Sequence, residues 1–440
     1  MKKVVLFGAG LVSPPLIRYL LDGGFHLTVA SLPGSGARKL VDSHPNARVL
    51  PLDVNDRDAL REQVAAADVA VSLLPAPFHP LVARACIDSG VHLVTTSYVS
   101  PEMRALDAEA RDKDVLLLNE MGVDPGIDHM SAMKVIHGEQ EKGSKLVGFS
   151  SWCGGLPAPE ANDNPFGYKV SWSPRAVLLA ARSSARYLLD GQIVDVPPEK
   201  LFTDPAVVEI PDIGTLEGYP NRDSVSYLDT YGFDNGQVRN MFRGTLRNQG
   251  HCQLRTQLSQ LGLFDDATEH DLTGTTSKAL METLFGAPLE DTIPRKLGVS
   301  AAQSPLEAMK HIGLLNDEPI GLDKASLLDV MAHHMEEGLA FKPGERDMLV
   351  MRHDLTFELD GGKGQERITA IMVNFGIPNG DSSMARTVAL PAAIGTRMVL
   401  DGDIELRGVQ IPIEPGIYRP VLAELKEQGI SFSETRSTVR

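Results

Sequence analysis

The chain has few cysteines and no long apolar run, and each absence excludes a class of protein. Cys86, Cys153 and Cys252 are odd in number and far apart, which excludes a disulfide framework and favours a reducing cytoplasm. No apolar stretch approaches the roughly 18 residues that cross a membrane, so no membrane partner is expected. The first residues lack the apolar core and the cleavage site of a signal peptide, and we expect them to form a strand instead.

Positive charge is also scarce. The chain has 42 Lys and Arg against 58 Asp and Glu, which gives a formal net charge of −16. Because there is no basic run, nucleic acid is not expected as a partner. An anionic substrate would need local arginines against this overall field. At 440 residues the chain exceeds the usual size of a single core, so more than one domain is expected.

The N-terminus has the pattern that opens a dinucleotide-binding unit. A short apolar run at residues 3–7 is followed by Gly8, Ala9, Gly10, Leu11 and Val12. The first glycine would allow a tight turn, the second would let a pyrophosphate approach the backbone, and amides at the start of the next helix would bind it. Ser13 replaces the third glycine of the motif, so a plain strand–helix turn is the alternative.

Alternating strands and helices continue this pattern as far as residue 118. We predict strands at 26–31, 48–52, 69–74, 92–96 and 115–118, with helices at 57–66, 80–89 and 101–111. This order predicts a Rossmann-like, doubly wound parallel sheet, an α/β fold. Ligands of such sheets bind at the carboxyl ends of the strands, where Ser31, Asp53, Leu74 and Ser97 stand.

The end of the second predicted strand should select between NAD and NADP. An acidic residue there would bind the ribose hydroxyl of NAD, and an arginine would bind the phosphate of NADP. The sequence has Ser31, Leu32 and Pro33, so neither signal is present. Arg38 and Lys39 open the next helix and could reach a 2′-phosphate, or they could form a solvated helix face. The choice of cofactor is left open.

The rest of the chain predicts an α+β domain interrupted by a helical insertion. Helices are expected at 127–137, 174–188 and 384–400, and strands at 145–151, 347–358 and 367–374. Between 257 and 344, Leu and Met recur at helical spacing. We therefore predict a dinucleotide-binding domain at 1–124, an α+β substrate domain at 125–256 and 345–440, and an all-helical insertion at 257–344.

Three segments, 119–129, 152–160 and 164–175, are dense in glycine, proline, carboxylates and carboxamides. Loops of this composition are seldom present for packing alone, and we interpret them as the floor of an active site. Pro125 and Gly126 would fix a sharp turn, and Gly154 and Gly155 would let the backbone come close to a bound molecule.

Several side chains in and near these loops could carry chemistry. Arg222 and Arg247 lie in segments interpreted as polar loops, and their planar guanidinium groups could bind a substrate with more than one carboxylate, or form two structural ion pairs. Cys153 could be a nucleophile or a thiol that lines the pocket. A metal could in principle be bound by four residues: Glu120, Asp124, Asp128 and His129. Their spacing matches no metal site, and hydride transfer needs no metal, so none is expected.

Several motifs together resemble the glutamate-forming saccharopine dehydrogenases along nearly the whole chain. They are Ser97-Tyr-Val-Ser-Pro101, Asn119–Asp128, Cys153-Gly-Gly-Leu-Pro-Ala-Pro-Glu160, Asn164–Arg175, Tyr219-Pro-Asn-Arg-Asp-Ser224 and Arg243-Gly-Thr-Leu-Arg247. The segments 345–352 and 383–388 look like the saccharopine dehydrogenase half of the bifunctional animal and plant enzymes. The resemblance implies oxidation of saccharopine by NAD(P)+ and water to glutamate and α-aminoadipate semialdehyde, by hydride transfer and then imine hydrolysis.

The resemblance also implies roles for individual residues. Asp124, Tyr98 and Cys153 are the candidates for proton transfer near the substrate nitrogen, although solvent water could do this work. Substrate contacts are expected at Ser97, Tyr98, Asp124, Arg222, Thr245, Leu246 and Arg247. Further cofactor contacts are expected at Leu32, Val54, Val123 and Ser173.

Two other functions are weighed against this one. A related reductase or synthase could act on a polyamine-type imine, as carboxynorspermidine dehydrogenase does, but its pocket would need carboxylates where Arg222 and Arg247 stand. A non-catalytic NAD(P)-binding protein would bind cofactor without turnover. The partner implied by the resemblance is a small molecule, saccharopine, and the chain could assemble as a homodimer.

Overall fold

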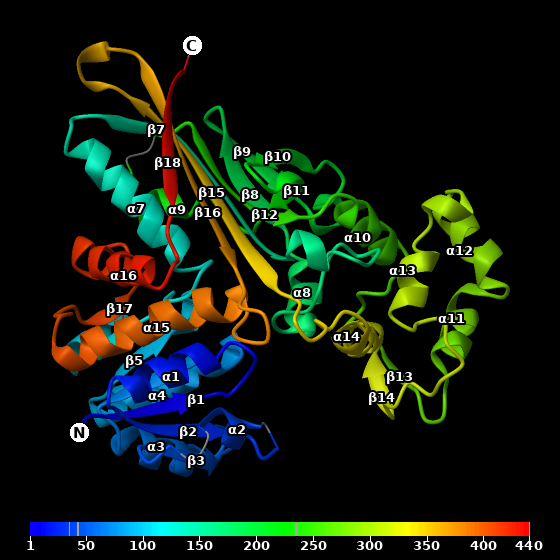
Figure 1. Cartoon of the computed structure of the whole chain (residues 1–440), viewed down its shortest axis with the longest axis horizontal. Coiled ribbons are helices and arrows are strands. Elements are labelled where there is room, and N and C mark those ends of the chain that lie inside the picture. The colour runs from blue at the N-terminus through cyan, green and yellow to red at the C-terminus, as the bar shows by residue number, and fades with distance from the viewer. Residues whose placement is uncertain (35, 42–43, 234–235, 440) are drawn as a thin grey trace.

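The computed structural model describes residues 1–440 except 35, 42–43, 234–235 and 440. Figure 1 shows a parallel sheet with its helices, a large mixed sheet above it, and a helical lobe to one side. The Rossmann-like α/β fold predicted for the N-terminal part, joined to an α+β unit with a helical insertion, is confirmed.

The parallel sheet has the strand order β17-β6-β5-β4-β1-β2-β3. Apolar residues of both faces are buried in these strands, because helices cover the sheet on both sides. The strands are β1 (Lys3–Phe7), β2 (His26–Ser31), β3 (Ala47–Pro51), β4 (Val69–Ser72), β5 (His92–Thr95), β6 (Leu116–Leu118) and β17 (Gly408–Gln410).

Helices of two groups cover the two faces of this sheet. One face carries α1 (Pro14–Asp22), α2 (Ala37–Val41) and α15 (Ser383–Asp401), and the other carries α3 (Arg57–Ala65), α4 (His79–Ser89), α5 (Pro101–Arg104) and α6 (Asp107–Asp112). The single helix predicted at 101–111 is wrong, because the chain breaks it into α5 and α6. After the break, Asp107 accepts a hydrogen bond from the Val409 amide of β17 (2.8 Å) and so attaches this segment to the sheet edge.

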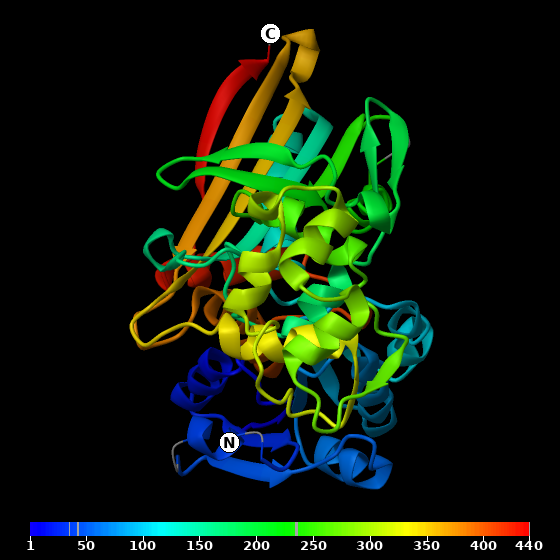
Figure 2. The same cartoon turned by 90° about the vertical axis from the view of Figure 1, so that its right-hand side faces the viewer.

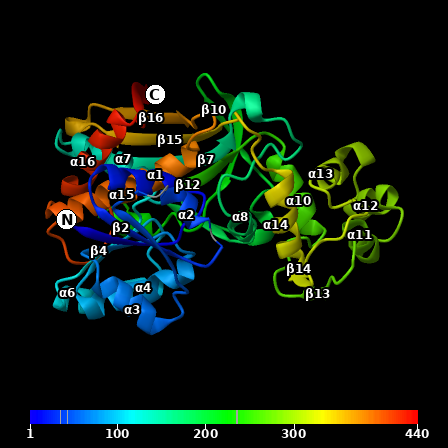
Figure 3. The same cartoon turned by 60° about the horizontal axis from the view of Figure 1, so that its bottom comes forward.

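The C-terminal part of the chain returns to the parallel sheet. α15 packs beside α1, as Figure 3 shows, and β17 pairs with β6 in parallel. The segment 345–440, expected to lie in the substrate domain, therefore supplies a strand and a covering helix to the other unit. β17 is only three residues long and has no hydrophobic pattern that could have revealed it. The other domain boundaries remain predictions.

The large sheet has the order β10-β11-β12-β7-β15-β16-β18, with the hairpin β8–β9 attached to β12. Its strands are β7 (Lys145–Pro157), β8 (Ala185–Leu189), β9 (Gln192–Val196), β10 (Ala206–Ile210), β11 (Gly214–Pro220), β12 (Asn240–Arg247), β15 (Asp347–Glu358), β16 (Gln365–Phe375) and β18 (Ser433–Val439). Its helices include α7 (Ile127–Gln140), α8 (Pro174–Ala180), α9 (Tyr227–Thr230) and α16 (Pro415–Glu427).

Two predictions in this region are wrong. Residues 152–157, interpreted as a loop, extend β7. A Cβ at Gly154 would come within 2.6 Å of the Leu246 carbonyl oxygen, so this glycine lets neighbouring strands approach rather than a ligand. The helix predicted at 174–188 ends at Ala180, and residues 185–189 form β8. The hairpin is fixed by Asp190 and Gly191, whose positive φ angles (49° and 80°) suit the tight turn between twisted strands.

The lobe at 257–344 is helical, with one short antiparallel ladder of β13 (Glu269–Asp271) and β14 (Lys324–Ser326) that was not expected. Its helices are α10 (His251–Gln260), α11 (Ser277–Phe285), α12 (Leu289–Leu297), α13 (Leu306–His311) and α14 (Leu327–Gly338). Figure 2 shows this lobe in front of the two sheets. Within the described residues, no helix is both long and apolar enough to cross a bilayer.

Gly126, between β6 and α7, holds a backbone conformation that other residues cannot adopt there. Its φ is +146°, and a Cβ would lie 2.0 Å from the Gly122 carbonyl oxygen. We therefore expect Gly126→Ala to lower the free energy of unfolding by at least about 3 kcal/mol, measured by urea denaturation.

Gly138, within the α7 helix that Gly126 precedes, is the matched control. A Cβ there would meet nothing within 4 Å, so Gly138→Ala should stabilise the chain by about 0.5–1 kcal/mol. Equal effects of the two substitutions would contradict the steric argument.

Candidate functional site

Residues predicted to contact a dinucleotide gather at the carboxyl edge of the parallel sheet. The segment 8–12 follows β1, Ser31 and Leu32 stand at the end of β2, Asp53 and Val54 follow β3, Leu74 follows β4, Ser97 follows β5 and Val123 follows β6. Because parallel strands end at one edge, the fold brings these residues together. Ser173 does not follow a strand of this sheet; it caps α8, where its hydroxyl accepts the Ala176 amide (3.3 Å).

The glycine turn fits a bound pyrophosphate. Gly8 has a φ of +98°, and its missing Cβ would lie 3.1 Å from the Leu73 carbonyl group, so only glycine can make this turn. A Cβ at Gly10 would meet nothing within 4 Å, so the backbone here faces open space that a phosphate can approach. The Ser13 hydroxyl is turned back to the Gly10 carbonyl (2.8 Å) and α1 starts directly afterwards.

The end of β2 has no acidic side chain to bind a ribose hydroxyl. Leu32 is 59 % exposed there, and Arg38 and Lys39 lie exposed on the short helix α2 that follows. Among the described residues between 32 and 41, the arrangement leaves cationic groups and no carboxylate.

A buried histidine orients Ser97. His79, at the start of α4, lies between the hydroxyl groups of Ser72 (2.9 Å from Nδ1) and Ser97 (2.7 Å from Nε2). Burial lowers the pKa of His79 to about 4, so the ring is neutral at pH 7. A neutral ring donates from one nitrogen and accepts at the other, and so it can fix both hydroxyl groups at the strand ends.

At the junction of the two sheets, Arg243 of β12 binds residues that follow β5 and β6. Its guanidinium group donates to Asp124, to Asp128 (2.8 Å) and to the Tyr98 hydroxyl (3.0 Å), and the Tyr98 hydroxyl donates to Asp124 (2.6 Å). The guanidinium also lies over the Tyr227 ring, 4.3 Å from its centre. The structure therefore brings together Tyr98 and Asp124, two of the residues expected to transfer protons.

Burial and mutual charge separate the two carboxylates. Burial raises the pKa of Asp124, with Arg243 acting against this rise and Asp128 adding to it. For Asp128, burial opposes ionisation, but the charges of His129 and Arg243 outweigh it and hold the pKa below its usual value. Asp128 is thus the fixed counter-charge of the site, and Asp124 is the carboxylate whose protonation is closer to the working pH.

A second chain of hydrogen bonds runs behind this pair. His129 bonds Glu120 (2.6 Å) through Nε2 and the Tyr231 hydroxyl (2.9 Å) through Nδ1, and Glu120 also accepts the Val99 amide (2.9 Å). Burial opposes protonation of His129, yet the nearby Asp128 and Glu120 raise its pKa. A protonated His129 with Arg243 balances the carboxylates that face the junction.

Cys153 lies on β7 beside Thr245 of β12, in the parallel register of the two strands. It is buried, and burial together with the charge of Asp124 raises its pKa well above the usual value. The pKa of the Tyr98 hydroxyl is also raised well above its usual value, first by burial. Both groups therefore stay protonated near neutral pH, which argues against Cys153 as a nucleophile.

The residues expected to bind substrate divide between two places. The exposed Arg222 lies 5.2 Å from the centre of the Tyr98 ring, whereas Arg247 lies over the Tyr168 ring at 5.5 Å. Arg247 is not in a loop as predicted, because it is the last residue of β12 and is buried. Leu246 points to the opposite face, into the core around Trp152, so only its backbone is available to a substrate.

Sequence reasoning missed the roles of Arg243, His79, His129 and Glu120. One signal was available for Arg243. Residues 243, 245 and 247 alternate along an eight-residue strand, so their side chains share one face. The histidine contacts join residues that no local pattern connects.

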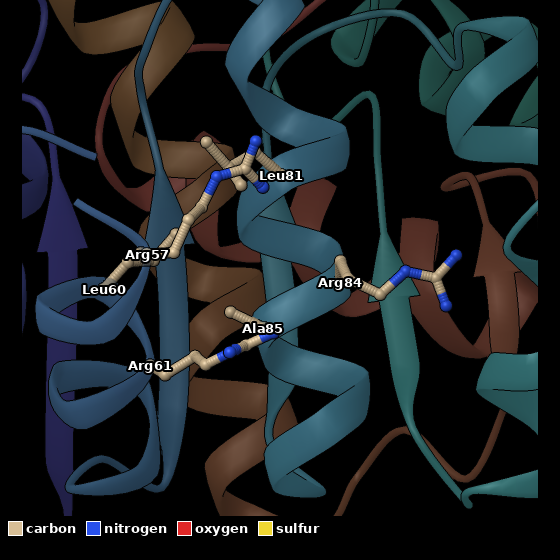
Figure 4. Close-up of a pocket in the computed structure, with 6 residues that line it drawn as sticks. All are labelled: Arg57, Leu60, Arg61, Leu81, Arg84 and Ala85. Carbon is tan, nitrogen blue, oxygen red and sulfur yellow. The ribbon is translucent and has the colours of Figure 1, made fainter. Parts of the chain in front are cut away.

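A cluster of three arginines elsewhere does not belong to this site. Figure 4 shows Arg57 and Arg61 of α3 pointing towards α4, while Arg84 points away from α3. Arg84 pairs with Glu109 and Arg61 lies 3.8 Å from Asp88, so this hollow on the outer face of the parallel sheet carries compensated charge.

The fold and the site define a two-domain dinucleotide-binding protein with an ionised network at the domain junction. Residues 4–118 match the family described as the saccharopine dehydrogenase NADP binding domain, and residues 122–430 match the saccharopine dehydrogenase C-terminal domain. The chain therefore belongs to the saccharopine dehydrogenase family.

Individual relatives agree with this assignment. The chain is 37% identical to "Saccharopine dehydrogenase [NADP(+), L-glutamate-forming]" of Pyricularia oryzae, over 98% of both chains. It is also 37% identical to the mitochondrial alpha-aminoadipic semialdehyde synthase of Bos taurus, over 100% of this chain but 48% of that protein. The chain thus spans about half the length of this relative. A solved structure of the apo saccharopine dehydrogenase (L-Glu forming) from Saccharomyces cerevisiae superposes with a TM-score of 0.88 at 35% identity, covering 100% of both chains.

The buried His79 predicts how stability depends on pH. Its pKa falls from 6.5 in the unfolded chain to about 4 in the folded chain, so between these values the unfolded chain binds more protons. The contribution of His79 to stability is therefore complete above pH 6.5 and is lost as the pH falls towards 4, by about 3 kcal/mol. In urea denaturation, His79→Gln should lose less stability than the wild type between pH 7 and pH 4.5.

His311→Gln, at an exposed position of α13, controls for the loss of an imidazole and should keep the wild-type pH dependence. An unchanged pH dependence in His79→Gln would contradict the assignment of a neutral ring between Ser72 and Ser97.

Proposed function

We propose that this chain oxidises saccharopine with NADP+ and water to glutamate, α-aminoadipate semialdehyde and NADPH, with release of a proton. The observation that carries the proposal is the Tyr98–Asp124–Arg243 network at the edge of the dinucleotide-binding sheet, beside Cys153 and Thr245 of the second sheet. Relatives that match along nearly their whole length bear the name of this activity, and their names give no support to a reductase of polyamine-type imines.

Asp124 is the group best suited to accept a proton. The substrate nitrogen must be neutral before the adjacent carbon gives up hydride, and the water that later adds to the imine must lose a proton. Tyr98 and Cys153 remain protonated near neutral pH, because burial raises the pKa of each well above its usual value. The pKa of Asp124 is raised from that of an ordinary carboxylate, which brings it closer to the working range of a general base.

The neighbours of Asp124 set its position and its charge. Arg243 stabilises the ionised form, and the Tyr98 hydroxyl donates to the same oxygen, Oδ1, that Arg243 contacts. After hydride loss, water adds to the imine carbon, and the carbon–nitrogen bond breaks as the nitrogen leaves as the amino group of glutamate. Asp124 takes the proton that the water loses and returns it to the nitrogen, which needs it to leave as an amine. The proton of the carbinolamine hydroxyl is released to water as the carbonyl forms, and Tyr98 holds Asp124 in position through its hydrogen bond.

NADP+ supplies the hydride acceptor when it is bound. The residues that would hold it are the glycine turn at 8–12, the strand ends at Ser31, Asp53, Leu74 and Ser97, and Val123. Leu32, Val54 and Ser173 would complete the contacts. Preference for NADP over NAD is supported by the exposed Arg38 and Lys39 after β2 and by the lack of an acidic residue there.

Substrate carboxylates would contact Arg222 and Arg247, with Ser97, Thr245 and the Leu246 backbone between them. Arg222 stands over Tyr98 and is exposed, so it can meet a carboxylate from the side of the nicotinamide edge.

A reducing compartment, in line with the expected cytoplasm, suits three buried free thiols. Assembly as a homodimer and the absence of a nucleic-acid partner also remain predictions.

The direct test is formation of NADPH from saccharopine, followed by absorbance, with NAD+ and NADP+ compared in turn. Glutamate and the semialdehyde should appear in equal amounts. Cofactor binding without turnover of saccharopine would leave only a nucleotide-binding role.

Replacing Asp124 tests the general base. We expect Asp124→Asn to lower kcat by about 10²–10⁴-fold and to remove the acidic limb of the pH–rate profile, because the amide cannot accept a proton. Steady-state kinetics across pH measure both effects.

Asp347→Asn is the matched control. Asp347 is another buried carboxylate with a pKa raised by burial, but it accepts the amides of Ser383 (2.6 Å) and Met384 (2.8 Å) at the start of α15. This variant should lose thermal stability and keep kcat. If Asp124→Asn changes only KM, Asp124 binds the substrate and is not the base.

Arg38 tests the choice of cofactor. Arg38→Ala should raise the KM for NADP+ about tenfold and leave the KM for NAD+ within about twofold, since only NADP+ carries the 2′-phosphate. Equal effects on both cofactors would show that Arg38 does not contact this phosphate. Lys39→Ala shows whether the adjacent lysine shares the contact.

A further inference from the structure

Two buried arginines, one at the end of β12 and one on α10, have no acidic partner in the part of the chain that the structure describes. Arg247 is 7 % exposed and Arg255, on α10, is 1 % exposed. Among the residues that the structure describes, neither guanidinium has a carboxylate within 4.0 Å. Burial of a cation without a counter-charge is costly, so this arrangement needs an explanation.

Three buried donors in this region lack an acceptor within the described part of the chain: Arg247 Nε, Arg255 Nη1 and the Tyr168 hydroxyl. They belong to one cluster. Arg247 lies over the Tyr168 ring, and Arg255 donates through Nε to His251 Nε2 (3.2 Å), whose ring is 6.2 Å from that of Tyr168. We call Arg247, Arg255 and Tyr168 the donor cluster.

His251 is neutral and therefore adds no charge to the donor cluster. Its Nδ1 donates to the Phe166 carbonyl (3.1 Å) and its Nε2 accepts from Arg255, which is the hydrogen bonding of a neutral ring. Burial, and then the two arginines, hold the pKa of His251 well below its usual value. The two arginines therefore keep an uncompensated charge.

Glu217 is an acidic residue that faces this region, but its carboxylate binds backbone amides and not the two arginines. It stands opposite Arg247 in the antiparallel register of β11 and β12. Its two carboxylate oxygens accept the amides of Gly250 (3.1 Å) and Cys252 at the start of α10. It caps that helix and makes no ion pair with Arg247.

The donor cluster also lies on the face of β12 where the chemistry takes place. Arg243, Thr245 and Arg247 alternate along the strand, so Arg247 follows Thr245 by about 7 Å on the same face. Arg243 already has two carboxylate partners, whereas Arg247 and Arg255 have none among the described residues. A ligand that reaches from Asp124 past Thr245 would bring its negative group to the guanidinium groups of Arg247 and Arg255.

We propose that Arg247, Arg255 and Tyr168 form a binding subsite for a carboxylate of the substrate, in which Arg255 supplies a second buried cation. A carboxylate offers acceptors on two oxygens and suits guanidinium donors and a hydroxyl. The identity of the substrate rests on the proposed function, but the carboxylate chemistry of the subsite does not.

Tyr168→Phe tests the subsite with the least disturbance, because the hydroxyl that it removes has no hydrogen-bond acceptor among the described residues. The probe is glutarate, a simple dicarboxylate, titrated by calorimetry, alongside the KM for saccharopine. We expect about tenfold weaker glutarate binding and a similar rise in KM, with Tm unchanged or higher.

Tyr418→Phe is the matched control. Tyr418 is equally buried, but its hydroxyl bonds His137 (2.9 Å) away from the site. This variant should lose thermal stability and keep glutarate affinity and KM. The opposite pattern in the two variants separates a role in binding from a role in packing.

Arg255 is tested by Arg255→Met and Arg255→Lys. The methionine removes the charge at similar length and should weaken glutarate binding and raise the KM for saccharopine more than tenfold, while the lysine should restore part of the affinity.

The results for the subsite and for the proposed substrate can be distinguished. If the wild type binds glutarate and Tyr168→Phe weakens it, the subsite stands even if saccharopine is not oxidised, and only the proposed substrate is lost. If the wild type does not bind glutarate, or if Tyr168→Phe and Arg255→Met bind it as the wild type does, the subsite is overturned.

Discussion

The site depends on one buried cation between two carboxylates. Arg243 projects from the mixed sheet and binds Asp124 and Asp128, which follow the last inner strand of the parallel sheet. An arginine this deeply buried is stable only because these charges and the faces of Tyr98 and Tyr227 surround it. The same contacts that stabilise the charge fix the distance between the dinucleotide edge and the substrate face. Removing Arg243 would leave two buried carboxylates without their shared cation.

Charge is distributed unevenly along the face of β12, so the two ends of this face differ in net charge. At one end the guanidinium of Arg243 is neutralised by two carboxylates, and one of them, Asp124, has a pKa raised by burial. At the other end Arg247 and Arg255 carry charge that no described side chain offsets. An acidic chain overall thus presents a local positive region, which an anionic substrate requires.

The sequence predicted the parallel sheet well because β1 to β6 are short apolar runs separated by turn residues, and this local pattern decides the fold. The prediction from sequence failed where contacts between residues far apart in the chain determine the local structure. Residues 152–157 are rich in glycine and look like a loop, but those glycines let β7 pack against its neighbours. The segment 185–189 continues a helical pattern until Asp190 and Gly191 turn it into a hairpin. Tyr98, Asp124 and Arg247 could be named from motifs, whereas the partners of His79 and His129 could not, since those contacts exist only after folding.

The return of α15 and β17 to the parallel sheet sets the order in which the protein can be completed during synthesis. The first 124 residues leave the ribosome with one face of the sheet short of the helix that packs beside α1, and with the edge of β6 unpaired. These apolar surfaces stay uncovered until about residue 410 has been made, after the whole mixed sheet except β18 and the whole helical lobe. Residues 1–124 are therefore translated before the rest of this sequence, yet their sheet is completed only after β17 has been made.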